Sequence, residues 1–429
     1  MQDYEPLAER ARRLKDLLAK QARRAFVLEL TGTPKAGKTS TIRLLETFFK
    51  TCGWRVHVVK ERAAECPIAM KGHFFFNTWT TCTMMAEVLE TADREYDLVI
   101  VDRGFFDALL WLELQRARHQ VDESEARIFE EFVTLERWRK LVDLTLVLSV
   151  SPATAIERET HDRILPRRGS LMNESSLLSF NEALDRATAR HGNHFKLLEA
   201  SSEAGDAKDV AAQVIGTVLE QIEPWVDTHV AVIPRATIEN LTRDSTALRY
   251  PSGWAELEAA VRFIPRSSAE RDPDVVQLVA NGVPTRDGGV FVFDRRSDPK
   301  RVGEYGQHAV LRGAHIEATS RSLVDAAKET VVSRFREGLH LNFEFEPEPL
   351  GFVWIPDGGA RLAQHAGLVF RVRIDDETVA QSLEEKEFKT NGRGHPMTSS
   401  FATLDALDEV QLEPWSDKVR SENWLKTPQ

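Results

Sequence analysis

The octapeptide at residues 32–39, GTPKAGKT, limits the possible folds of this chain more than any other feature of the sequence. It satisfies the pattern G-x-x-x-x-G-K-[S/T]. It follows a short apolar run at residues 25–30 and opens a segment, 39–49, in which apolar residues recur at helical spacing. Glycines at a strand-to-helix turn let consecutive backbone N–H groups point at phosphate oxygens, and the helix N-terminus adds positive potential. The motif therefore predicts a loop that holds a triphosphate tail.

The residues of this loop have separate predicted tasks. Lys38 should neutralise the β- and γ-phosphates, and the hydroxyl of Thr39 should bind Mg²⁺. ATP or GTP together with Mg²⁺ are therefore the expected cofactors. The predicted nucleotide-binding residues are Gly32, Thr33, Pro34, Lys35, Ala36, Gly37, Lys38, Thr39 and Ser40.

Strands alternate with helices through residues 1–224, which predicts βαβ units and a parallel sheet flanked by helices. Near-continuous apolar runs such as DLVIV are typical of strands that are buried on both faces of a sheet. Strands are expected at residues 25–30, 55–59, 97–101, 144–150 and 196–198. Helices are expected at 74–89, with Trp79, Met84, Met85 and Leu89 on the apolar side, and at 209–222.

The pattern changes after Pro224, which places a second domain at residues 225–429. Here strand-like runs dominate and one clear helix is expected, at residues 322–336. These features predict an α+β domain with a mixed or antiparallel sheet. The expected strands lie at 229–233, 289–293, 339–345, 351–355 and 367–374.

Composition excludes several classes of function. A net charge of -11 argues against duplex DNA or RNA as an obligate partner, although a local basic pocket for one nucleotide or a free 5′ end remains compatible. Three cysteines without C-x-x-C spacing argue against a disulfide framework or a zinc site. No apolar run approaches the roughly 20 residues of a membrane-spanning helix. A cytoplasmic protein without membrane contact is expected, and it could form a homo-oligomer.

A second motif narrows the class of the N-terminal domain. The DLVIV strand ends in Asp102-Arg103, and an Asp at the carboxyl end of a central strand lies beside the phosphate loop. There it can bind Mg²⁺ or accept the proton of an acceptor hydroxyl, while Arg103 can reach a phosphate. In these residues the chain resembles the thymidylate-kinase and deoxynucleoside-kinase branch of P-loop kinases. Members carry a polar residue a few positions on, and Asp107 occupies that place.

The resemblance extends toward the lid of these kinases. Residues 149–158, SVSPATAIER, are similar to the strand and helix start that precede the lid. Arg163, Arg167 and Arg168 follow in a Pro/Gly-marked segment, where such kinases place arginines that stabilise the transferring phosphoryl group. A solvated basic turn is the alternative interpretation of this segment. The catalytic set that the resemblance implies is Lys38, Asp102, Arg103, Arg163 and Arg167.

The acceptor site is expected near residues 58–62, VVKER. Glu61 and Arg62, together with Asp107, are the predicted substrate-binding residues for a nucleoside or nucleotide. The chain lacks the Glu-Pro-Gly-Gly-type turn that is common in thymidylate kinases, so the acceptor stays open. The aromatic residues at 74–76 and Trp79 would either stack on a base or pack in the core.

Residues 226–420 resemble the Nudix fold, in its predicted-phosphoesterase branch. An active Nudix helix has the pattern R-E-U-x-E-E, in which several glutamates bind Mg²⁺. Here Val332 and Ser333 replace the last two glutamates, and Glu329 remains, with Asp325 and Glu317 as misplaced helpers. The residues that carry the resemblance are GVFVFDR at 289–295, RGAHIE at 312–317, DAAKE at 325–329, QHAGLVF at 364–370 and LEPWS at 412–416.

This domain is therefore predicted to be catalytically silent, with a ligand-binding or regulatory role. The acidic residues at 344–348 are interpreted as a solvated strand end, with a replacement metal site as the alternative. His308, His315 and His365 show no metal-ligand spacing and are expected to be structural.

Four functions are compatible with the sequence. The leading hypothesis is a nucleoside or nucleotide kinase that transfers phosphoryl groups from Mg·ATP. The alternatives are an NTP-hydrolysing switch or sensor, for example in stress or antiviral signalling, a 5′-hydroxyl polynucleotide kinase, and true Nudix diphosphate hydrolysis through Glu329.

Overall fold

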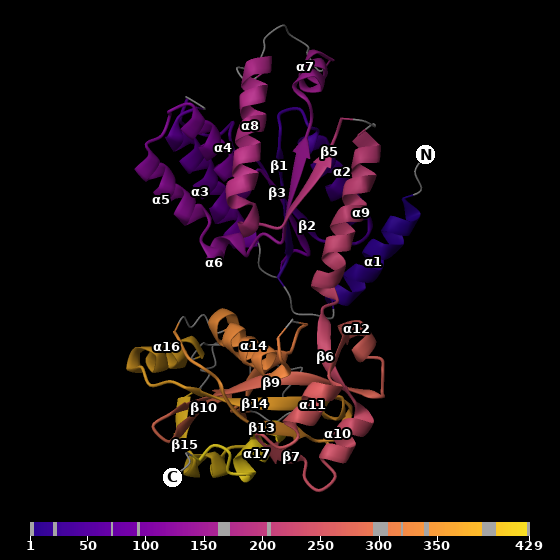
Figure 1. The fold of residues 1–429 in the computed structure, drawn as a ribbon, viewed down its shortest axis with the longest axis vertical. Coiled ribbons are helices and arrows are strands. Elements are labelled where there is room, and N and C mark those ends of the chain that lie inside the picture. Colours follow the sequence, from indigo (N-terminus) through magenta and orange to yellow (C-terminus); the bar gives the residue numbers. More distant parts are fainter. Residues whose placement is uncertain are drawn as a thin grey trace. The chain divides into compact units, whose positions relative to one another are not determined.

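A computed structural model of the chain divides into two compact units, Met1–Val226 and Asp227–Gln429. Each unit has its own sheet and core (Figure 1). The structure describes residues 4–19, 24–69, 72–91, 95–161, 172–203, 207–294, 308–318, 321–338, 343–387 and 400–426.

The first unit is built on a five-stranded sheet in the order β2-β3-β1-β4-β5. Every neighbouring pair is parallel, so the predicted α/β fold with a parallel sheet is confirmed. All seven residues of the central strand β1 are buried, as expected for a strand covered on both faces. The strands are β1 (Phe26–Gly32), β2 (Val56–Val59), β3 (Leu98–Asp102), β4 (Leu144–Ser149) and β5 (Leu197–Ser201).

Helices cover both faces of this sheet. They are α1 (Glu5–Ala19), α2 (Lys38–Thr51), α3 (Phe74–Thr91), α4 (Phe105–Ala117), α5 (Glu123–Val133), α6 (Glu136–Arg139), α7 (Pro152–His161), α8 (Glu174–His191), the 3-10 turn η1 (Gly192–His194) and α9 (Ala207–Val226). Among the described residues of the whole chain, no helix has the length and apolarity that a membrane crossing requires.

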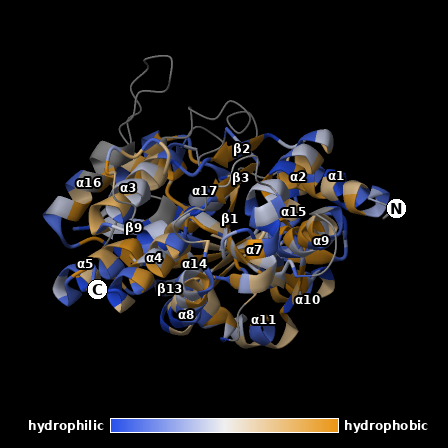
Figure 2. Ribbon diagram, turned by 90° about the horizontal axis from the view of Figure 1, so that it is seen from above, coloured by the Kyte–Doolittle hydropathy of each residue, from blue (hydrophilic) through white to orange (hydrophobic). Residues whose placement is uncertain are grey.

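The alternation of side chains along β1 separates two cores. Leu28 and Leu30 pack with α1, α2 and α9, whereas Val27 packs on the other face with α3, α4 and α8. The two groups of helices lie on opposite sides of the sheet in Figure 1. The strands β1 and β3 are largely apolar along their length (Figure 2).

Two details of the predicted helices differ in the structure. The apolar side of α3 includes the buried Met84 and Met85, but Leu89 is 48% exposed, so its predicted place on the buried side is wrong. Leu89 lies in the last turn of α3, where the helix approaches its end at Thr91. Helix α9 continues through Pro224 to Val226, beyond the predicted end at residue 222.

The junction of β1 and the loop requires glycine at position 32. Gly32 has φ +127, and a Cβ there would lie 1.8 Å from the carbonyl oxygen of Leu148 on the neighbouring strand. We expect Gly32→Ala to destabilise the first unit by more than about 4 kcal/mol, because backbone and not a flexible side chain blocks the added methyl. Urea unfolding would measure this loss.

Gly53→Ala is the matched control for this substitution. Gly53 also has a positive φ, +84, but nothing lies within 4 Å of the position that a Cβ would take there. The control should cost about 1–2 kcal/mol, the strain of a left-handed residue alone. Equal losses for the two variants would contradict the steric explanation.

The second unit contains a ten-stranded mixed sheet, which confirms the predicted α+β class. Its long central strand β9 pairs in parallel with β14 and antiparallel with β10, β12 and β6. The strands are β6 (His229–Pro234), β7 (Ala247–Arg249), β8 (Arg262–Pro265), β9 (Val275–Arg286), β10 (Gly289–Asp294), β11 (His308–Ala309), β12 (Arg312–His315), β13 (Glu348–Trp354), β14 (His365–Arg373) and β15 (Ser400–Thr403).

The expectation of one helix in this unit is wrong. The predicted segment forms α14 (Leu323–Gly338), but several short helices accompany it, which carry too few turns for a clear period. They are α10 (Arg235–Leu241), α11 (Trp254–Ala260), α12 (Arg266–Ala269), α15 (Ala360–Ala363), α16 (Glu377–Glu387), the 3-10 turn η2 (Asp405–Glu409) and α17 (Pro414–Ser421). Of the predicted strand at 339–345, residues 339–342 lie outside the described residues, and 343–345 are not strand.

Candidate functional site

The glycine-rich loop connects β1 to the N-terminus of α2, as its sequence predicts. Lys35 and Gly37 both have positive φ, 62° and 84°, and Gly37 is the residue that precedes the helix. Thr39 and Ser40, in the first turn of α2, are exposed to solvent. The loop thus presents a helix N-terminus and two exposed hydroxyl side chains to whatever occupies the space in front of it.

The ammonium group of Lys38 is held inside the loop. Its Nζ donates hydrogen bonds to the carbonyl oxygens of Gly32, at 2.9 Å, and Thr33, at 2.8 Å. Burial and, to a smaller extent, the nearby Arg103 lower the pKa of Lys38 to about 7, against the opposing effect of surrounding carboxylates. An incoming anion would therefore favour the charged form of this side chain.

The start of the loop is anchored to β4. Thr33 is buried; its N–H donates to the carbonyl of Leu148 at 2.9 Å, and its hydroxyl accepts the N–H of Val150 at 3.0 Å. Gly32 is buried as well. The predicted loop residues thus divide into buried anchors at its start and cavity-lining residues from Lys35 onward.

Helix α7 braces the loop from the other side. The guanidinium of Arg158 donates to the carbonyl oxygen of Lys35 at 3.1 Å and to the hydroxyl of Ser202 at 3.1 Å. The Lys35 ammonium pairs with Glu159 at 2.9 Å. The sequence resemblance includes Arg158 in the segment before the lid without giving it a role, and its contact with the loop is visible only in the tertiary structure.

A cavity of about 740 Å³ lies in front of the loop, and we call it the donor cavity. It is lined by residues of the loop and of α7 and by Arg103. Several cationic groups line it, which suits a polyphosphate. The lining residues are Lys35, Ala36, Gly37, Lys38, Thr39, Ser40, Thr41, Arg103, Thr154, Glu157, Arg158, His161, Ser202 and Val210.

Asp102 is the last residue of β3 and pairs in register with Leu30 of β1, just before the loop. Burial raises the pKa of its carboxyl to about 6, although Arg103 and Lys38 both act to lower it. Asp102 therefore lies beside the glycine-rich loop, as the sequence predicts. The predicted roles of Asp102 and Thr39 as Mg²⁺ ligands remain predictions.

Arg103 occupies a strained and central position. Its backbone has φ 67 and its N–H donates to the carbonyl of Leu30 at 3.0 Å. The guanidinium lies between two carboxylates, with Nε 3.0 Å from Glu61 and a terminal nitrogen 3.2 Å from Asp107. These carboxylates raise the pKa of Arg103 against the opposing effect of burial, so its charge is fixed at every pH of interest.

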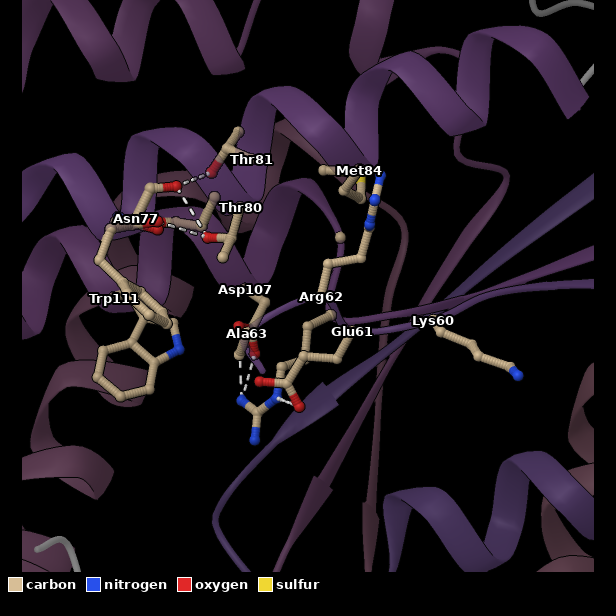
Figure 3. Close-up of a pocket in the computed structure, with 14 residues that line it drawn as sticks. Lys60, Glu61, Arg62, Ala63, Asn77, Thr80, Thr81, Met84, Asp107 and Trp111 are labelled. Carbon is tan, nitrogen blue, oxygen red and sulfur yellow. Dashed lines mark hydrogen bonds and ion pairs between the residues drawn. The ribbon is translucent and has the colours of Figure 1, made fainter. Parts of the chain in front are cut away.

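A second cavity of about 200 Å³ adjoins Arg103, and we call it the acceptor cavity. All three predicted substrate-binding residues, Glu61, Arg62 and Asp107, line it (Figure 3). The side chain of Lys60 extends away from Glu61 in the same view. The other lining residues are Lys60, Ala63, Phe76, Asn77, Thr80, Thr81, Met84, Arg103, Gly104, Ala108 and Trp111.

The aromatic residues at 74–76 and Trp79, expected either to stack on a base or to pack in the core, do not share one environment. Phe76 lines the acceptor cavity, as does Trp111, which the sequence does not single out. Phe75 is 61% exposed, and Phe74 packs edge-on against Phe129 in the core. The Trp79 ring lies 5.9 Å from the guanidinium carbon of Arg62. Helical geometry sends these neighbouring side chains in different directions, so they do not act as one surface.

Asp107 and Asn77 are buried polar residues at the wall of the acceptor cavity. Asp107 accepts a hydrogen bond from the Thr31 hydroxyl at 2.6 Å, and Asn77 donates to the carbonyl of Ala108 at 3.0 Å. Sequence reasoning misses Asn77, although an Asn on the apolar side of a helix is a signal for a buried hydrogen bond. The predicted lid residues Arg163, Arg167 and Arg168 lie outside the described residues.

In the second unit, the Nudix-like helix α14 presents no gathered carboxylates along its described side chains. Glu329 lies 3.4 Å from Arg321, and Asp325 accepts a hydrogen bond from Ser322 at 2.7 Å. Among the residues that the structure describes in both units, no cluster of three or more His, Cys, Asp or Glu side chains could hold a metal. The catalytic silence of this unit stays a prediction.

The remaining acidic and histidine residues of this unit have local partners. Glu346 pairs with Lys328 at 2.7 Å, and Glu348 lies 3.3 Å from Arg373. His315 and His365, from strands on either side of β9, approach to 3.2 Å between their Nε2 atoms, a contact that sequence spacing could not indicate. Burial lowers the pKa of His315 to about 3 and also lowers that of His365, so this pair is neutral at physiological pH.

No protein-family model and no curated protein matches this chain. Solved structures give weak matches that each cover less than half of the chain. Deoxyadenosine kinase from M. mycoides with bound dCTP is 19% identical, with a TM-score of 0.36, over 46% of this chain and 100% of the kinase. The same kinase with bound dATP gives 18% identity and a TM-score of 0.34, over 45% and 99%.

A further weak match is to a protein whose description names it a Nudix hydrolase. Tm1382, described as a candidate Nudix hydrolase, is 14% identical with a TM-score of 0.33, over 46% of this chain and 98% of that protein. TM-scores of this size do not establish a shared family. The function of the chain therefore rests on its own residues.

Proposed function

We propose that the first unit is a phosphotransferase of the nucleoside- or nucleotide-kinase type, which moves the γ-phosphoryl group of Mg·ATP or Mg·GTP to a small nucleoside-like acceptor. The second unit would bind a ligand or regulate the first. The observation that carries this proposal is that Arg103 lines two cavities at once, one bounded by the glycine-rich loop and one by α3 and α4.

The residues around the donor cavity fit a magnesium nucleotide. The loop backbone and Lys38 would hold the phosphates, and the exposed Thr39 hydroxyl with the Asp102 carboxylate would hold Mg²⁺. When bound, the metal would neutralise charge on the phosphates. Arg158, already bonded to the loop carbonyl of Lys35, would add positive charge at the cavity wall.

The buried position of Lys38 gives nucleotide binding a defined proton linkage. Without a ligand its pKa is about 7, whereas a bound triphosphate would restore a value nearer the ordinary 10.5. Nucleotide binding should therefore be accompanied by uptake of a proton at pH values between about 7 and 10.5. Below about pH 6, where Lys38 is already protonated, little proton uptake is expected. Calorimetry at pH 8.5 in two buffers of different ionisation enthalpy would show the uptake, and identical apparent enthalpies would contradict it.

The acceptor cavity supplies what a transfer reaction needs beyond a phosphate site. The Glu61 side chain is 41% exposed and lines this cavity, so it can accept a hydrogen bond from an acceptor hydroxyl. As the hydroxyl oxygen forms its bond to phosphorus and the bond to the β-phosphate oxygen breaks, the hydroxyl proton would pass to a carboxylate, Glu61 or Asp102. Arg103 would stabilise the charge that develops between the cavities.

The same cavity distinguishes this proposal from the alternative of an NTP-driven switch. A switch that hydrolyses its nucleotide needs a site for water, whereas this chain provides a lined cavity with aromatic and polar walls next to Arg103. Walls of that kind are typical of sites for small organic ligands. A 5′-hydroxyl polynucleotide kinase would need a path for a longer strand.

An acceptor screen tests the proposal. The protein with labelled Mg·ATP would be offered nucleosides, nucleoside monophosphates and 5′-hydroxyl oligonucleotides, with Lys38→Ala alongside. We expect the wild type to phosphorylate at least one nucleoside or monophosphate and Lys38→Ala to phosphorylate none. ADP formation that ignores every acceptor would instead favour the switch, and transfer restricted to oligonucleotides would favour the polynucleotide kinase.

The Nudix alternative needs a separate arm of that screen. Nucleoside diphosphate derivatives would be incubated with the wild type, Lys38→Ala and Glu329→Gln. Because Glu329 pairs with Arg321 and belongs to no metal-binding cluster of the described residues, we expect no cleavage. Cleavage that survives in Lys38→Ala and disappears in Glu329→Gln would assign hydrolysis to the second unit.

A further inference from the structure

Glu29 is a carboxylate in the middle of a fully buried strand. It belongs to β1, is 0% exposed, and lies in register between Val101 of β3 and Thr145 of β4. Its side chain is on the face of the sheet that α4 covers, where Val27 and Val101 are packed in an apolar core. It is not among the residues that line the donor and acceptor cavities.

The carboxylate binds the first turn of α4. One oxygen accepts the N–H groups of Gly104 and Asp107, both at 3.0 Å, and the other accepts the N–H of Phe106 at 3.2 Å. The first N–H groups of a helix have no partner within the helix, and Gly104, which precedes α4, has no capping side chain of its own. Glu29 therefore supplies the cap from a neighbouring strand.

The glycine at position 104 is matched to this arrangement. A Cβ there would lie 2.6 Å from the carboxyl carbon of Glu29, so a larger residue would push the carboxylate from the helix turn. The two residues on either side of this turn, Arg103 and Asp107, form the ion pair at the wall of the acceptor cavity. The turn that Glu29 binds is thus the segment that places both of them.

This contact is costly for the folded protein, which argues against a packing role alone. Burial raises the pKa of Glu29 to about 7, with a further contribution from Asp107, although the backbone N–H groups oppose the shift. An apolar side chain would fill the same space without burying a charge, but it would leave the N–H groups of Gly104, Phe106 and Asp107 without this acceptor. A buried carboxylate here stabilises one geometry of the turn more than it stabilises the fold.

We infer that Glu29 is a positioning residue for phosphoryl transfer: its carboxylate fixes the Arg103–Asp107 turn and thereby the guanidinium between the donor and acceptor cavities. This inference rests on the proposed function. If it holds, the rate of phosphoryl transfer depends on a buried strand residue that lines neither cavity.

The test uses Glu29→Gln in the full chain, with Thr145→Val as the matched control. The glutamine side chain has the same shape, and its oxygen can still accept the N–H groups of Gly104 and Asp107. Its NH₂ group would then face the N–H of Phe106, and two donors cannot form a hydrogen bond with each other. Thr145 is buried and its hydroxyl lies 3.5 Å from the same carboxylate, on the neighbouring strand. We expect Glu29→Gln to lower kcat about 10- to 100-fold and to raise the acceptor KM, because small displacements of aligned groups are costly in transfer reactions.

Two further readouts separate positioning from stability. The Kd for Mg·ATP should stay within about twofold in both variants, and amide hydrogen exchange at residues 104–107 should rise in Glu29→Gln and not in Thr145→Val. If Glu29→Gln does not fold, Glu29→Asp, which withdraws the charge by one methylene, should show the same kinetic and exchange changes. A folded variant with wild-type kcat, KM and exchange overturns the inference.

Failure of the proposed function would look different. A wild type that phosphorylates no acceptor refutes the kinase proposal, whatever Glu29 does. In that case hydrogen exchange still tests the structural part of the inference, that the Glu29 carboxylate fixes the turn: unchanged protection at residues 104–107 in Glu29→Gln overturns this part, and lost protection supports it.

Discussion

Replacing Lys38 with alanine is expected to reduce phosphoryl transfer about 10³-fold or more, the range found when a charge-stabilising group is lost at a transferring phosphoryl. The loop encloses this ammonium through its bonds to Gly32 and Thr33, so a more distant cation cannot take its place. Steady-state rates with a fixed acceptor and varied Mg·ATP would measure the loss.

Lys50→Ala is the control for this substitution. Lys50 lies near the other end of α2, on the surface, and pairs with Glu46 at 2.7 Å. It should leave the rate unchanged and the stability within about 0.5 kcal/mol. If Lys38→Ala keeps a tenth or more of the wild-type rate while remaining folded, the glycine-rich loop does not hold the transferred phosphate.

Replacing Arg103 with alanine is expected to combine a loss of transfer with a loss of stability. The rate should fall about 10²- to 10³-fold, because Arg103 is the cationic residue that lines both cavities. The substitution also leaves the buried Asp107 without its cation, which costs about 3–5 kcal/mol when one member of a buried pair is removed. Acceptor-dependent kinetics and urea unfolding would measure the two effects.

A double variant separates these two effects. Adding Asp107→Asn removes the uncompensated charge while its carbonyl oxygen can still accept the Thr31 hydroxyl. The pair Arg103→Ala/Asp107→Asn should regain most of the lost stability and none of the transfer rate. Arg118→Ala, at the exposed end of α4, is the control and should change neither quantity. Recovery of activity in the double variant would show that Arg103 acts only through the fold.

The fold class and the glycine-rich loop can be predicted from the sequence because both depend on local patterns. A strand that is covered on both faces is mostly apolar, and this pattern marks β1, β3 and β4. The loop motif is contiguous, so its glycines and Lys38 need no knowledge of the rest of the chain. Most of the helices missed in the second unit escape prediction for the opposite reason, since one or two turns carry no measurable period.

The sequence identifies the candidate acceptor residues, but it does not show that they line one cavity. Glu61 follows β2, whereas Arg103 and Asp107 follow β3, and nothing in their spacing says that these strands are neighbours. The aromatic residues at 74–76 show the limit of such reasoning, because α3 turns three adjacent rings toward three different surroundings.

The sequence by itself determined the glycine-rich loop between β1 and α2, the parallel sheet behind it and the change of architecture after Pro224. Only the tertiary structure decided that Arg103 lies between two cavities and that Glu29 caps the first turn of α4. The physical reason is that a loop motif and an apolar strand depend on residues close in sequence. An ion pair or a helix cap across a sheet depends on strand order, and this order is fixed only when the whole core packs.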